Sequence, residues 1–169
     1  MFMRNTLLTL AVLSGLAGLA QEKIQWMTIE KAYELSLTEE NPKKIFIDVY
    51  TDWCGWCKRM DKATFQNPEV AAYMNEYYYN VKFNAEQQED ISILNNTFKF
   101  VAQGKRGYHE LAAALLNGKM SYPTVIFMNH TFEMLSPVPG YQEPKQFMKV
   151  ANFFGSNAYK NTDWNEYSN

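Results

Sequence analysis

The chain has 169 residues, of which 47% are hydrophobic and 20% charged, and its formal net charge is −2. A chain of this length can enclose one hydrophobic core without cross-links or a structural metal, so we expect a single ordinary domain. The composition excludes a disordered chain. The small negative charge is not that of a polyanion-binding protein, which argues against nucleic acid as a partner.

The first twenty residues have the pattern of a secretory signal peptide. Arg4 precedes an uncharged apolar run from Leu7 to Leu19, and small residues occupy positions 18 and 20. This run is shorter than the roughly 20 residues that a membrane-spanning helix needs. We therefore predict a signal peptide over 1–20, cleaved after Ala20, and export to the periplasm. An uncleaved membrane anchor is the alternative.

After this leader, hydrophobic periodicity and capping residues predict alternating helices and strands. The segment 45–50 is apolar and rich in β-branched and aromatic residues, which is typical of a strand covered on both faces of a sheet. The elements expected up to residue 84 are a helix over 29–38, a strand over 45–50, helices over 57–65 and from 68 onward, and a strand over 77–83.

A long stretch separates these elements from the next strand. We interpret it as a helical insertion over about 87–120, with helices over 89–101 and 108–116. Strands over 123–128 and 132–138 then form a hairpin, and a last helix spans 144–154. The segment 156–169 is expected to be a loosely attached tail. This order predicts an α/β domain over 21–155, with a mixed central sheet flanked by helices.

Cys54 and Cys57 are the only cysteines, and they are poorly suited to stabilise the fold. A disulfide between residues three apart closes almost no loop, so it removes little entropy from the unfolded chain. At the start of a helix, however, the two side chains share one face and can form and break a bond reversibly. The helix N-terminus favours a thiolate at Cys54, which we predict to be the nucleophile. Cys57 is expected to be less exposed and to resolve the mixed disulfide.

Three separated features resemble the thioredoxin family: the segment from Trp53 to Lys58, Asp48 six residues before the first cysteine, and Tyr122-Pro123-Thr124 at the start of a later strand. The resemblance covers about residues 27–155 without the insertion, and it implies a thioredoxin fold. It also implies that Asp48 accepts the proton of Cys57, and that Pro123 forms a cis peptide bond. An Asp48 that only caps the following loop is the alternative. Trp56 replaces the proline that thioredoxin has between its cysteines.

The resemblance implies a thiol–disulfide oxidoreductase that acts on substrate proteins through transient mixed disulfides and needs no cofactor. We expect Trp53, Trp56, Tyr122 and Pro123 to bind the substrate. Reduction is the favoured direction, and it requires a thiol electron donor such as a membrane reductase. A disulfide oxidase or isomerase of the same fold is one alternative. A protein-binding module without catalytic activity is the other.

A metal site is the competing interpretation of the cysteine pair. Only His109 and His130 could join the two cysteines as ligands, and neither is spaced from them like a ligand. We therefore expect no metal, and we interpret both histidines as exposed polar residues.

Overall fold

A computed structural model describes residues 22–104 and 106–169. The predicted signal peptide, and the membrane anchor that is its alternative, lie outside the described residues. Within the described part, no helix is both long and apolar enough to cross a membrane. The elements are β1 (Trp26–Met27), α1 (Ile29–Thr38), β2 (Lys44–Tyr50), α2 (Gly55–Met60), the π-helical turn η1 (Asp61–Phe65), α3 (Pro68–Tyr77), β3 (Tyr78–Asn84), β4 (Ile91–Ile93), β5 (Asn96–Phe98), β6 (Phe100–Gln103), β7 (Arg106–His109), α4 (Glu110–Leu115), β8 (Thr124–Met128), β9 (Met134–Pro139), α5 (Pro144–Gly155), the 3-10 turn η2 (Ala158–Lys160) and α6 (Trp164–Ser168).

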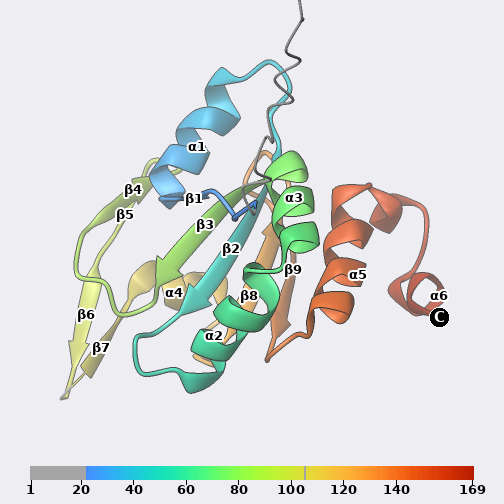
Figure 1. Ribbon diagram of the computed structural model, residues 1–169. Coiled ribbons are helices and arrows are strands. Elements are labelled where there is room, and N and C mark those ends of the chain that lie inside the picture. The colour runs from blue at the N-terminus through green and yellow to red at the C-terminus, as the bar shows by residue number, and fades with distance from the viewer. Residues whose placement is uncertain (1–21, 105) are drawn as a thin grey trace, which may run out of the picture.

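The central sheet has five strands in the order β1-β3-β2-β8-β9, as the ribbon in Figure 1 shows. Strands β1, β3 and β2 are parallel, whereas β8 runs antiparallel to β2 and β9 antiparallel to β8. The predicted mixed sheet is therefore confirmed. Strand β2 lies in the middle of this sheet, so the loop that follows it begins at the centre of one sheet end.

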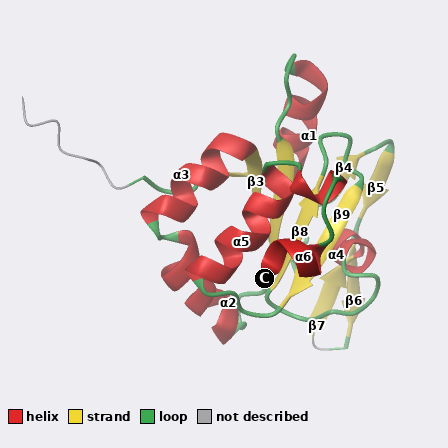
Figure 2. Cartoon of the chain, turned by 90° about the vertical axis from the view of Figure 1, so that its right-hand side faces the viewer, coloured by secondary structure: helices red, strands yellow, loops and turns green. Residues whose placement is uncertain are grey.

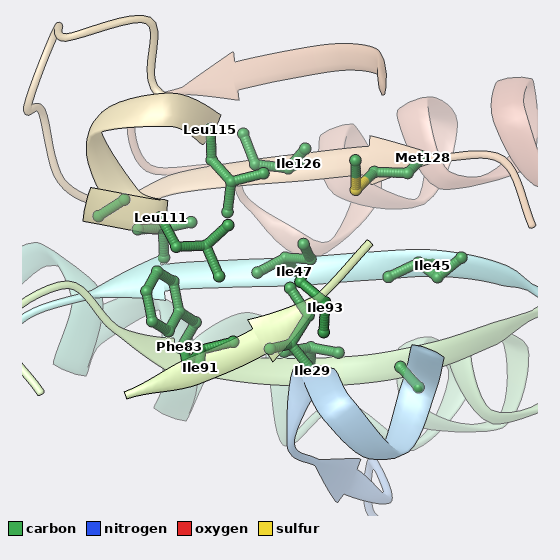
Figure 3. Packing of buried hydrophobic residues seen from close by; sticks show 14 of the residues in the cluster. Ile29, Ile45, Ile47, Phe83, Ile91, Ile93, Leu111, Leu115, Ile126 and Met128 are labelled. Carbon is green, nitrogen blue, oxygen red and sulfur yellow. The ribbon is translucent and has the colours of Figure 1, made fainter. Parts of the chain in front are cut away.

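Two hydrophobic cores cover the two faces of the sheet, because successive side chains of a strand point to opposite faces. Ile45, Ile47 and Val49 of β2 pack on one face against α1, the hairpin β4–β5 and α4. Figure 3 shows Ile45 and Ile47 within this cluster. Phe46 packs on the other face, against α3 and α5. Asp48 follows the same alternation, so it lies on the face of Phe46, which is also the face of α2.

The insertion differs from the prediction, because residues 89–101 form strands and not a helix. Ile91 and Ile93 are buried and Ser92 is exposed, the period of a half-buried strand. Leu94 and Asn95 have φ of 53° and 60°, which makes a two-residue turn into β5. A second hairpin, β6–β7, follows. Only α4 is helical, and it starts at Glu110 and not at 108.

The C-terminal segment is not loosely attached, so this expectation is also wrong. Helix α6 folds back onto α5, as Figure 2 shows. The ring of Phe153 in α5 lies 5.2 Å from that of Trp164 and 5.0 Å from that of Tyr167. Aromatic residues near the chain end therefore extend the second core.

Candidate active site

The cysteine pair lies where the central strand β2 passes into helix α2. Residues 51–54 make a tight turn, in which the Cys54 N–H donates to the Thr51 carbonyl at 3.1 Å. Cys54 is then the N-cap of α2, and its Sγ accepts a hydrogen bond from the Cys57 N–H at 3.1 Å. The two residues form a disulfide with their Cα atoms 5.3 Å apart. An amide N–H directed at Cys54 Sγ favours a thiolate there after reduction.

The two cysteines are almost equally buried, with 5% of Cys54 and 6% of Cys57 exposed. The expectation that Cys57 is less exposed is therefore wrong for the oxidised protein. The physical reason is that the disulfide holds both sulfurs together within one helical turn, where they share the same surroundings. The difference between them is in position, because only Cys54 is the N-cap that accepts an amide N–H.

Asp48 lies on β2, directly beside Lys82 of β3, and it is 2% exposed. Lys82 Nζ is 3.0 Å from Asp48 Oδ2 and also pairs with Asp61 at the start of η1. Asp48 Oδ1 is buried and has no hydrogen-bond partner within the described residues. Burial raises the pKa of Asp48, and the nearby Lys82 ammonium opposes this shift only in part.

A small cavity of about 120 Å³ lies between Cys57 and this ion-pair network. Its lining residues are Tyr50, Thr51, Asp52, Cys57, Lys58, Asp61 and Lys82. The cavity has room for a few water molecules, each of which needs roughly 30 Å³. Cys57 and Lys82 thus line the same cavity, whereas Asp48 does not line it and is joined to it through the ion pair with Lys82.

The strand β8 begins beside this site, after a cis peptide bond between Tyr122 and Pro123. The Pro123 carbonyl accepts a hydrogen bond from the Gly140 N–H at 2.8 Å. The main-chain N–H and C=O of Tyr122 make no hydrogen bond within the described part of the chain. The Tyr122 ring meets that of Trp53 edge to face at 5.9 Å. Two of the expected substrate-binding residues, Trp53 and Tyr122, are therefore in contact.

The tryptophans of the motif are unusually exposed for their size, Trp53 by 51% and Trp56 by 55%. Each lies under an arginine guanidinium: Arg59 over Trp56 at 5.2 Å, and Arg106 of the β6–β7 hairpin over Trp53 at 4.6 Å. The Trp53 indole N–H donates to the Glu86 carboxylate, with both oxygens at 3.0 Å.

Sequence reasoning missed several residues of the site: Lys82, Asp61, Arg59, Arg106 and Glu86. Of these, only Lys82 could have been found from the sequence, since it is a charged residue within the predicted strand over 77–83, as Asp48 is within the strand over 45–50. Arg106 lies within the insertion, far from Trp53 in the sequence, and no local sequence pattern indicates that the two side chains are in contact.

The two histidines differ from each other in the structure. His130 is exposed, as expected. His109 is fully buried, so the expectation for it is wrong, and its Nδ1 accepts the N–H of Leu111 as the cap of α4. Among the described residues there is no group of three or more His, Cys, Asp or Glu side chains that could bind a metal ion.

Comparison with protein families gives one match over most of the chain. The family model Thioredox_DsbH, described as protein of unknown function DUF255, matches residues 11–155.

Comparison with solved structures identifies the fold. A thioredoxin-fold protein from Helicobacter pylori superposes with a TM-score of 0.56 at 20% identity, over 82% of this chain and 91% of that one. A DsbH oxidoreductase gives a TM-score of 0.54 at 18% identity, over 89% and 94%. A Bacteroides thetaiotaomicron protein proposed to be a disulphide isomerase gives 0.54 at 26% identity, over 81% and 98%. The chain has the thioredoxin fold.

Curated relatives are much longer proteins. The thiol:disulfide interchange protein DsbD of Photorhabdus laumondii is 30% identical over 112 residues, which are 60% of this chain and 19% of that protein. An uncharacterized Caenorhabditis elegans protein, B0495.5, is 26% identical over 109 residues, 55% of this chain and 15% of that protein. The chain therefore spans less than a fifth of these two relatives.

Proposed function

Since this chain belongs to the thioredoxin-fold family Thioredox_DsbH (DUF255) and has the paired cysteines of a thiol–disulfide oxidoreductase, we propose that it reduces protein disulfides outside the cytoplasm. The observation that carries this proposal is the Cys54–Cys57 disulfide at the start of α2, directly after the strand that holds the buried Asp48, in a fold whose next central strand begins after a cis-proline. Location outside the cytoplasm rests on the signal peptide predicted over 1–20.

In the first step, the Cys54 thiolate attacks a sulfur of the substrate disulfide. A bond forms between Cys54 and that sulfur, and the other substrate sulfur leaves as a thiolate that takes a proton from water. Cys57 then loses its proton toward Asp48, through the cavity that it shares with Lys82. The Cys57 thiolate attacks Cys54 Sγ, which re-forms the Cys54–Cys57 disulfide and releases the second substrate thiolate. The substrate gains two electrons and the enzyme loses two.

Asp48 suits the role of proton acceptor because two opposing influences act on it. Burial raises its pKa, which makes the carboxylate a better base than an ordinary aspartate. The Lys82 ammonium at 3.0 Å still favours the ionised form, which the transfer needs as its starting state.

Substrate binding has a main-chain component and an apolar one. The unpaired N–H and C=O of Tyr122 can pair with an extended substrate chain, as in strand addition to a sheet. Exposed tryptophan rings at Trp53 and Trp56 supply apolar contact area on the same surface. Pro123 fixes the direction in which the Tyr122 main chain points.

A catalytic cycle requires an electron donor that reduces the Cys54–Cys57 disulfide again. We propose a membrane-bound thiol reductase for this step, since relatives of this chain are named thiol:disulfide interchange protein. Reduction outside the cytoplasm otherwise stops after one turnover.

Replacement of the resolving cysteine tests the chemistry. Cys57→Ser should accumulate mixed disulfides with client proteins through Cys54, because nothing then attacks Cys54 Sγ. The adducts are counted on non-reducing gels and should disappear on addition of dithiothreitol. Cys54→Ser is the matched control and should trap far fewer adducts. A Cys57→Ser protein that traps no client would favour the protein-binding module.

The direction of electron flow is tested by the reduction potential. Equilibration of the wild-type protein in glutathione mixtures, with free thiols counted after alkylation, should give a value near the roughly −270 mV of thioredoxin. A value near the roughly −120 mV of strong disulfide oxidants would overturn the reductase assignment and favour the oxidase or isomerase.

A further inference from the structure

Arginine is rare in this chain and is concentrated at the redox site. The sequence has three arginines, Arg4, Arg59 and Arg106, of which the last two lie in the described residues. Both lie over aromatic rings beside the disulfide. The Arg59 guanidinium carbon is 5.2 Å from the ring centres of Trp56 and Tyr141, and that of Arg106 is 4.6 Å from the ring centre of Trp53.

The insertion brings Arg106 to this place. Arg106 is the first residue of β7, at the tip of the β6–β7 hairpin, and this tip lies at the same end of the molecule as α2 in Figures 1 and 2. Gly107 follows it, and a Cβ atom there would lie 2.1 Å from the ring of Phe100 and 2.5 Å from the Val101 carbonyl oxygen. The close packing that glycine permits fixes the hairpin next to Arg106.

Neither guanidinium forms a salt bridge with an acid of the described chain. Within the described residues Arg59 and Arg106 make no ion pair, although Lys31, Lys82 and Lys99 all do. Glu86 lines the same pocket as Arg106, but both of its oxygens lie 3.0 Å from the Trp53 indole nitrogen, and it makes no ion pair with the arginine.

A guanidinium that lies over an aromatic ring can still bind an anion. The contact with the ring uses none of its five N–H donors, which form a planar fork that matches a carboxylate. The aromatic contact also holds the side chain in place, so that less conformational entropy is lost on binding. Because the two arginines lie on different rings, each can bind its own carboxylate.

We propose that Arg59 and Arg106 select client proteins whose reactive disulfide is flanked by acidic residues, one carboxylate for each arginine. This inference rests on the proposed function, because it names the substrate class of the same site. The β6–β7 hairpin then has a specific role: it places Arg106, which lies over Trp53, on the surface that binds the substrate.

Binding is the first test, and it does not depend on redox chemistry. The probes are fluorescently labelled peptides in which serine replaces cysteine, and this serine is flanked on both sides by Glu, Gln or Lys. Each peptide is titrated with the oxidised protein, and binding is measured by fluorescence anisotropy. The Glu peptide should bind about tenfold more tightly than the Gln peptide, and the Lys peptide more weakly than both. This preference should decline in 0.5 M salt.

Arginine variants assign the preference to residues. Arg59→Gln and Arg106→Gln should each reduce the Glu-to-Gln affinity ratio severalfold, and the double variant should bring it close to one. Arg106→Lys, which keeps the charge but not the fork, should retain only part of the ratio. Lys62→Gln is the matched control, since Lys62 is exposed on η1 and makes no ion pair within the described part, and it should leave the ratio unchanged.

Reduction rates of the corresponding disulfide-bonded peptides separate the two proposals. A double variant that still prefers the Glu peptide, or a wild type with no preference, overturns the role of the arginines. A preference in binding without reduction of any peptide overturns the reductase and leaves the anion-binding surface standing.

Discussion

Asp48, Lys82 and Asp61 form a linear network in which one lysine lies between two carboxylates. Lys82 is held by Asp48 at 3.0 Å on its buried side and by Asp61 on its more exposed side. Burial alone would lower the pKa of Lys82, but the two carboxylates together raise it, so the ammonium stays charged. The lysine is therefore a fixed positive charge beside Asp48, and Asp48 is the group of the pair that can change its protonation.

Replacement of Asp48 should change how stability depends on pH. A carboxyl group whose pKa is raised by folding binds its proton more tightly in the folded state, so the folded state gains stability at low pH. This contribution is complete below the ordinary aspartate pKa near 4 and is lost as the pH rises through the raised value. The wild type should therefore lose stability between pH 4 and pH 8 through this group, and Asp48→Asn should lack that loss.

Urea unfolding of both proteins at pH 4, 6 and 8 measures this effect. Glu40→Gln is the matched control, because Glu40 is exposed and makes no ion pair within the described residues. A pH profile of Asp48→Asn that parallels the wild type would show that burial does not perturb this carboxyl.

Single residues were predictable from the sequence only where a motif defines them. Fixed spacings or neighbours mark Cys54, Cys57, Asp48 and Pro123. Their roles stay predictions until the variants are measured. Arg106 has neither, because it reaches Trp53 only through the pairing of β6 with β7 and the register of that hairpin. Contacts between side chains on separate elements depend on the packed fold, which local sequence does not specify.

At the scale of elements, the long strands and helices were predictable and the insertion was not. Strands β2, β3 and β8 of the central sheet are largely apolar runs of five to seven residues, and α1 and α3 begin at good N-caps, Thr28 and Asn67. In the insertion β4 and β5 have three residues each, too few for a clear period of two. Their turn contains Leu94 and Asn95 with positive φ and no glycine to mark it.

His109 connects two parts of the insertion. Its Nδ1 accepts the Leu111 N–H at 3.2 Å at the start of α4, so the proton of the neutral ring is on Nε2, which lies 3.1 Å from the Glu89 carbonyl oxygen before β4. The ring also meets Phe83 of β3 edge to face at 5.6 Å. One side chain thus fastens α4 and the start of the hairpins to the sheet.

We expect His109→Ala to destabilise the protein by about 2–4 kcal/mol, through loss of the helix cap, of a buried hydrogen bond and of ring packing. His109→Asn should recover part of this loss, because asparagine caps helices well. Urea unfolding at pH 7 gives the free energies. His130→Ala is the matched control and should lie within about 0.5 kcal/mol of the wild type, since His130 is exposed. Equal effects of the two alanine variants would contradict this account.

The whole molecule places its chemistry at one end of a sheet that is packed on both faces. Cys54 follows the carboxyl end of β2, the usual location of functional groups in α/β sheets. The two cores hold β2 from both sides, and this keeps Asp48 in register with Lys82. Fold class followed from the order of elements, but the packing of the C-terminal segment did not, because its three aromatic residues are separated by polar ones at irregular intervals and show no period.

That C-terminal segment should contribute measurably to global stability. Phe153 is only 6% exposed because Trp164 and Tyr167 cover it, and Trp164 also meets Tyr167 at 6.3 Å. Trp164→Ala removes two aromatic contacts and uncovers Phe153, so we expect the free energy of unfolding to fall by about 1–3 kcal/mol. Leu37→Ala is the matched control, because Leu37 is 68% exposed on α1 and its removal should change stability by less than about 0.5 kcal/mol. Urea unfolding followed by circular dichroism, which does not depend on the fluorescence of the deleted indole, compares the two. If Trp164→Ala unfolds at the same urea concentration as Leu37→Ala, the contacts of α6 with Phe153 add nothing to the stability of the second core.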